Sequence, residues 1–115
     1  MDRDQNNAPY SPWGRIQGVT KIVRGVRFVS TARHGGLMIT RGAAEKHLSA
    51  AAVRYATSYG GYLCFEEDCL CSIPFYENPE WLEKLVAGKS SASKEELEQS
   101  IRQWTPGYFR GLETC

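Results

Sequence analysis

Two short segments of the chain gather residue types that could do chemistry, and the first is centred on a histidine. His34 is followed by Gly35 and Gly36, so the backbone can approach a ligand while a loop presents the imidazole. That imidazole could act as a general base or as a ligand. The simpler interpretation is a turn histidine bonded to nearby backbone, with glycines that supply positive φ.

The second segment, residues 66–71, holds three carboxylates and two thiols. If the chain is an enzyme, we expect Cys69 to be the nucleophile and His34 its base, provided that the fold brings them within hydrogen-bond reach. The neighbouring acids would raise the pKa of the Cys69 thiol, which is the wrong direction for a thiolate. The alternative is that the cysteines are small buried residues and the acids form a solvated turn.

A metal site could be assembled at the same segment if the fold brings in His34 or His47. Structural zinc usually takes two pairs of cysteines, each pair about two to four residues apart. Cys69 and Cys71, with Cys64 upstream, do not supply that pattern. The sequence therefore predicts no structural zinc and gives no basis for a cofactor.

Charge is unevenly distributed along a chain whose net charge is only +1. Residues 1–60 hold nine Lys or Arg and three acids, whereas residues 61–115 hold five bases and ten acids. A protein with one basic and one acidic region can bind partners of either sign, unless the two halves interleave in the fold. The candidate partner-binding acids are Glu66, Glu67, Asp68, Glu77, Glu80 and Glu83, and the candidate nucleic-acid-binding bases are Arg15, Lys21, Arg24 and Arg27.

Length and composition predict one ordinary globular domain. The chain has 115 residues, of which 42% are hydrophobic, and its mean hydropathy is −0.43. We expect residues 1–12 to be a flexible N-terminal arm and residues 13–115 to be a single α+β domain. Without an apolar run of about 20 residues or a signal-like start, the protein is expected to be soluble and cytoplasmic, with no membrane partner.

The elements that must position these residues follow from periodicity and end signals. Apolar and β-branched runs predict strands over residues 16–23, 26–31, 37–40, 62–65 and 69–76. Helices are predicted over residues 43–59, from Pro79 to about Ala87, and after a capping box that begins at Ser93. On the last helix, Leu97, Ile101 and Trp104 form one apolar stripe expected to face the core. The fold class is α+β, a small antiparallel sheet of about five strands packed against about three helices.

Four spaced segments also carry a resemblance. They are Pro12-Trp13-Gly14, the run from Val29 to Gly36, the run from Glu66 to Cys69, and the run from Trp104 to Tyr108. Together they resemble a family of small uncharacterised domains carried by bacteriophages, plasmids and other mobile elements. The resemblance implies a context of host–parasite conflict inside a bacterial cell and no established chemistry.

That context favours a protein of the anti-CRISPR kind, which acts by binding. We therefore expect an inhibitor that covers a host defence protein or complex, such as a CRISPR effector, with its acidic residues. One alternative is a small Cys/His or metal-dependent enzyme that uses His34 and Cys69. A second alternative is a nucleic-acid-binding accessory protein, although no Walker loop, Rossmann fingerprint or helix-turn-helix signature supports specific nucleotide binding.

Overall fold

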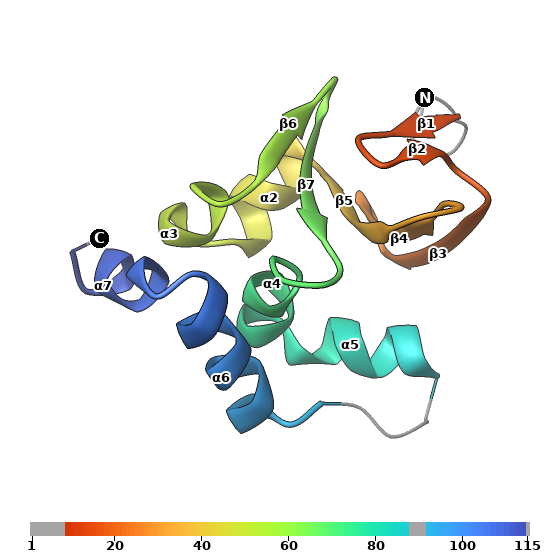
Figure 1. The fold of residues 1–115 in the computed structure, drawn as a ribbon. Coiled ribbons are helices and arrows are strands. Elements are labelled where there is room, and N and C mark those ends of the chain that lie inside the picture. The colour runs from red at the N-terminus through yellow and green to blue at the C-terminus, as the bar shows by residue number, and fades with distance from the viewer. Residues whose placement is uncertain (1–8, 88–91, 115) are drawn as a thin grey trace.

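A five-stranded antiparallel sheet organises the computed structural model, which describes residues 9–87 and 92–114 (Figure 1). Its strand order is β3-β4-β5-β7-β6, and every neighbouring pair is antiparallel. The strands are β3 (Gly18–Val23), β4 (Val26–Ser30), β5 (Gly35–Thr40), β7 (Tyr62–Glu66) and β6 (Thr57–Tyr59). Strands β3 and β4 form a hairpin that is joined by Arg24 and Gly25, and Gly25 has a φ of +81°.

The remaining elements are helices and one short ribbon. The helices are α2 (Arg41–His47), α3 (Ala50–Val53), α4 (Ser72–Glu77), α5 (Pro79–Val86), α6 (Lys94–Trp104) and α7 (Gly107–Thr114), and the ribbon pairs β1 (Tyr10–Ser11) with β2 (Gly14–Arg15). The α+β class and the five-stranded sheet are confirmed, with six helices in the described residues in place of about three. None of these helices has the length and apolar character needed to cross a membrane.

The segment expected as a flexible N-terminal arm lies largely outside the described residues. Tyr10 and Ser11, which belong to that segment, lie in β1, and residues 1–8 are not described.

Side chains alternate between the two faces of the sheet and so divide the core. On the helical face, Leu37 and Ile39 of β5 and Phe65 of β7 join the main cluster with residues of α4, α5, α6 and α7. On the opposite face, Val29, Met38 and Cys64 form a smaller cluster, with Trp13 and Ile16 packed against it. Each buried side chain of this size contributes about 1.5–3 kcal/mol relative to exposure. The central strands of the sheet therefore bury side chains on both faces.

The expectation of one helix over residues 43–59 is wrong. Helix α2 ends at His47, the following Leu48 has an extended backbone, and Ser49 starts α3 by accepting a hydrogen bond from the Ala52 N–H. Residues 57–59 then pair with β7 as strand β6. A strong N-cap placed inside an apolar periodic run splits the helix, because it offers the backbone an alternative start.

The expectation of a strand over residues 69–76 is also wrong, since residues 72–77 form α4. The chain turns beforehand, where the Glu66 carbonyl accepts hydrogen bonds from Leu70 N at 3.0 Å and Cys71 N at 2.9 Å. Pro74 lies in the first turn of α4, where its missing N–H costs no intrahelical hydrogen bond. The fifth strand of the sheet is therefore β6, in place of the strand expected over residues 69–76.

Glu77 connects three helices inside the fold. Its carboxylate accepts hydrogen bonds from Ser49 N at 2.9 Å, from Ser49 Oγ at 2.5 Å and from the Tyr108 hydroxyl at 2.5 Å. Tyr108 is 1% exposed, as expected for a residue that packs back onto the core. Burial, and then the Glu77 carboxylate, raise the pKa of Tyr108 above its ordinary value. These bonds join the end of α4 to the starts of α3 and α7.

Helix α6 begins as predicted but buries only part of its expected stripe. Ser93 and Glu96 form the capping box. Leu97 and Ile101 are buried, whereas Trp104 is 57% exposed, so its expected core position is wrong. The chain turns at buried Thr105, which donates from its N–H and its hydroxyl to the Ile101 carbonyl. The turn ends the helix at Trp104, and Tyr108 joins the core in its place.

The two tryptophans should differ sharply in their contribution to stability. Trp81 is 1% exposed in the main cluster, so Trp81→Ala should lower the free energy of unfolding by about 3–5 kcal/mol. Trp104→Ala should change it by less than about 1 kcal/mol. Urea unfolding followed by circular dichroism measures both values, and equal losses would contradict the placement of α6.

Candidate functional site

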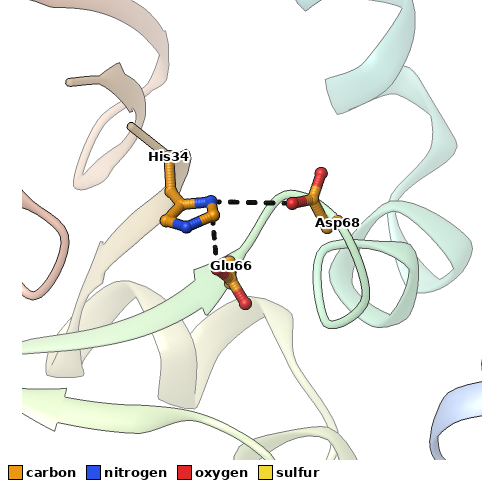
Figure 2. Close-up of side chains that lie close together, drawn as sticks. All are labelled: His34, Glu66 and Asp68. Atoms are coloured by element: carbon orange, nitrogen blue, oxygen red, sulfur yellow. Dashed lines mark ion pairs between the residues drawn. The ribbon is translucent and has the colours of Figure 1, made fainter. Parts of the chain in front are cut away.

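Three side chains from the two segments with candidate chemistry meet at one end of the central strands. His34 Nδ1 lies 3.5 Å from Oε2 of Glu66 and 3.6 Å from Oδ2 of Asp68. Figure 2 shows the imidazole reaching from the loop between β4 and β5 toward both carboxylates. Glu66 is the last residue of β7, and Asp68 lies in the turn that follows it.

Thr31 fixes the loop that carries His34. The Thr31 hydroxyl accepts hydrogen bonds from the N–H groups of Arg33 and His34, both at 3.2 Å, and donates to the His34 carbonyl at 2.6 Å. The Thr31 N–H donates to the same carbonyl at 3.0 Å. A threonine that bonds its own turn in this way stabilises the backbone of that turn. The backbone position of His34 is therefore held by its own loop.

Backbone pairing joins this loop to the acidic turn. Gly36 pairs with Glu66 in the sheet, and the Gly35 carbonyl accepts a hydrogen bond from Glu67 N at 2.9 Å. A Cβ atom at Gly36 would collide with the Phe65 carbonyl and would lie 2.6 Å from Cη2 of Trp13. The glycine is therefore needed for close approach of strand β7 and of Trp13.

Three of the four segments that carry the resemblance are thus neighbours in space, through Trp13, Gly36 and Glu66. The family model described as a domain of unknown function, DUF7007, matches residues 6–115. The chain belongs to this family. Comparison with curated proteins found no match, and comparison with solved structures found none either.

In this DUF7007 domain, Cys69 is poorly prepared to be a nucleophile. Its Sγ lies 3.7 Å from Oε1 of Glu66, as donor to the carboxylate. Burial raises the pKa of the Cys69 thiol, and Glu66 and Asp68 raise it further. The expected effect of the acids is confirmed, and it keeps the sulfur protonated near neutral pH. Glu66 thus contacts both Cys69 and His34, one through each carboxylate oxygen.

The other cysteines that the structure describes are structural. Cys64 and Cys71 are buried, and burial raises the pKa of the Cys64 thiol to about 12. The Cys71 Sγ donates to the Phe65 carbonyl at 2.9 Å. These two residues behave as the small buried residues of the alternative interpretation.

The DUF7007 site can hold a cation. One imidazole nitrogen and one oxygen from each carboxylate all lie within 4.8 Å of one another. The side chains of His34, Glu66 and Asp68 are 49%, 30% and 69% exposed, so an ion could reach them from solvent. All three are candidate residues in the sequence, which allows a metal site of His34 with residues 66–71 but lacks the cysteine pattern of structural zinc. The sequence signal for their convergence is that His34 precedes one predicted strand and Glu66 follows another.

The remaining acids expected at a partner interface divide into two groups. Glu67, Glu80 and Glu83 are exposed, whereas the Glu77 carboxylate is occupied by its bonds to Ser49 and Tyr108. Those internal bonds give Glu77 a structural role.

The four bases expected to bind nucleic acid do not share one exposed surface. Arg15, Lys21 and Arg24 are exposed, but Arg27 is only 6% exposed. Its Nη2 donates to the Tyr62 hydroxyl at 2.6 Å, and its guanidinium lies 5.2 Å from the centre of that ring. The buried guanidinium of Arg27 therefore links strand β4 to Tyr62 of strand β7.

The glycine at the junction of the site can be tested against a glycine that has space around it. Gly36→Ala should lower the free energy of unfolding by about 2–3 kcal/mol, because the new Cβ would meet the Phe65 carbonyl and Trp13. A Cβ atom added at Gly42 of α2 would have no neighbouring side chain or distant backbone within 4 Å. Gly42→Ala should therefore leave the free energy of unfolding unchanged or raise it by up to about 1 kcal/mol. Chemical unfolding of both variants measures the difference, and a neutral Gly36→Ala would contradict the close approach of β7.

Proposed function

We propose that His34, Glu66 and Asp68 bind a divalent metal ion and that this centre makes the chain a small metal-dependent enzyme. The observation that carries the proposal is the convergence of three potential ligand atoms from two separate loops within 4.8 Å. This function is one of the alternatives that the sequence left open. His34 keeps its expected role in it, and the carboxylates of Glu66 and Asp68 take the role expected of Cys69.

The spacing of the three groups supports an ion better than it supports a direct ion pair. The Nδ1–oxygen distances of 3.5 and 3.6 Å exceed an ordinary N–H···O hydrogen bond, which is about 2.9–3.0 Å long. Ligand atoms that each lie about 2.0–2.2 Å from one ion are separated by roughly 3.0–3.6 Å. The two nitrogen–oxygen distances lie at the upper end of this range.

The donor set indicates the class of ion and its chemistry. One imidazole and two carboxylates suit zinc, manganese or ferrous iron. Three protein ligands leave coordination positions open, which is the arrangement of catalytic rather than structural sites. The open positions would let the ion polarise a substrate oxygen or a bound water. The hydrogen bond from Cys69 to the other oxygen of Glu66 would orient that carboxylate.

Metal titration of purified variants tests this proposal. One Mn²⁺ or Zn²⁺ per chain should bind, and His34→Ala or Asp68→Asn should each weaken binding by at least about tenfold. Binding should also weaken as the pH falls, because protons compete for the ligand atoms. Isothermal titration calorimetry and Mn²⁺ electron paramagnetic resonance give the affinity and the stoichiometry.

The matched control is Glu67→Gln, which removes a charge from the same turn without removing a ligand. Glu67→Gln should bind the ion as the parent does, and thermal melts should show every variant to be folded. Absence of stoichiometric binding, or equal weakening by Glu67→Gln, would overturn the proposal.

We also propose a second function, the inhibition of a bacterial defence system by protein binding. The supporting observation is that Glu67, Glu80 and Glu83 are exposed and form no ion pair with the residues that the structure describes. Such carboxylates could face the basic nucleic-acid channel of a host complex, such as a CRISPR effector. The resemblance to domains of phages, plasmids and mobile elements supplies the context for this anti-CRISPR-like activity.

Charge reversal away from the metal ligands separates the second function from the first. Glu67→Lys with Glu83→Lys should abolish capture of the host complex and inhibition in cells, because like charges would then face each other. Glu45→Lys with Glu95→Lys makes the same change in net charge at other exposed positions and should retain activity. Equal activity of both double variants would exclude the acidic surface as the binding site.

A further inference from the structure

A cavity of about 400 Å³ lies at the end of β5 opposite to His34. It is open to solvent and is bordered by the turn between β3 and β4 on one side and by helix α2 on the other. Its lining residues are Val23, Arg24, Gly25, Thr40, Gly42, Ala43, Lys46 and His47. Its volume falls at the small end of the range for ligand sites, which is about 300–1,000 Å³.

The ionisable residues that line this cavity are all basic. Arg24 comes from the hairpin turn, and Lys46 and His47 come from the last turn of α2. No carboxylate is among the lining residues, and none of the three bases forms an ion pair with the residues that the structure describes. Glu45 lies beside Lys46 in sequence but does not line the cavity. The site therefore presents positive charge that its own walls do not neutralise.

The walls of the cavity are held by packing and by backbone hydrogen bonds. The Gly25 carbonyl accepts a hydrogen bond from Thr40 N at 2.8 Å. A Cβ atom at Gly25 would lie 2.7 Å from Oγ1 of Thr40 and 2.9 Å from Cβ of Ala43. The hairpin turn is therefore pressed against the start of α2, and this contact fixes where Arg24 leaves the backbone.

The opposite wall is anchored through His47. Its ring contacts Trp81 edge to face, with the ring centres 5.5 Å apart. Its carbonyl accepts a hydrogen bond from Asn78 Nδ2 at 3.2 Å. Because Trp81 is 1% exposed, this contact ties the imidazole to the main core. Two sides of the cavity thus carry basic groups on well-packed elements.

We propose that this cavity binds a small phosphorylated molecule by its phosphate group. A guanidinium can bind two phosphate oxygens at once, and an ammonium adds a second positive charge. The His47 imidazole supplies a further donor to the same group. The small volume suits a molecule about the size of a nucleoside monophosphate or a sugar phosphate.

This site is separate from the proposed metal centre. Strand β5 has six residues between the two ends, so at about 3.3 Å per residue the sites lie roughly 17–20 Å apart. Failure of metal binding at His34 would therefore leave phosphate binding at this cavity unaffected.

Titration with adenosine 5′-monophosphate and with inorganic phosphate tests the proposal. Calorimetry should detect one site per chain for at least one of the two probes. Arg24→Gln together with Lys46→Gln should weaken that binding by more than about tenfold, since both charged contacts to phosphate are removed. Metal affinity at His34 should be unchanged in the same variant.

Lys21→Gln with Arg15→Gln is the matched control. These two residues are exposed bases that do not line the cavity, and the change in net charge is the same. The control should bind the probe as the parent does. Equal weakening in both double variants would indicate general attraction of anions and would overturn the proposal. Failure of both probes to bind would overturn it as well.

Discussion

The antiparallel pairing of β5 with β7 is the constraint on which both the core and the candidate site depend. Its register places Leu37 opposite Phe65 and Gly36 opposite Glu66. Since side chains alternate between faces, a slip of one residue would move Leu37 away from the helical core. The same slip would separate Glu66 from the loop that carries His34. Hydrophobic packing over the whole sheet therefore holds the geometry of a polar cluster at its end.

Local sequence signals are sufficient to predict those elements whose ends are determined by neighbouring residues. The β3–β4 hairpin needs a residue such as Gly25 with positive φ, and α6 needs the Ser93 capping box. The elements that were missed depend on distant residues. Ser49 restarts the chain as α3 while bonded to Glu77, which lies 28 positions away. Periodicity within residues 43–59 contains no information about that partner.

The candidate site was predictable as a set of residues but not as an arrangement. His34, Glu66 and Asp68 were each singled out by type, and the acids were correctly expected to raise the pKa of Cys69. Their convergence depends on which strands are neighbours, and the order β4-β5-β7 is not contained in any local pattern. Arg27 shows the same limit, because its charge predicted exposure and its cross-strand position buries it against Tyr62.

The uneven charge of the two halves of the sequence survives in the fold in an altered form. The two halves interleave, since β7 of the acidic half lies between β5 and β6 of the basic half. The interleaving places Glu66 and Asp68 at the end of β5 where Gly35 lies, and Arg24 and Lys46 at the end where Thr40 lies. The first end has acids that attract a cation, and the second has bases that attract an anion. One buried strand thus separates an acidic end of the sheet from a basic end, and its hydrophobic residues hold the two ends apart.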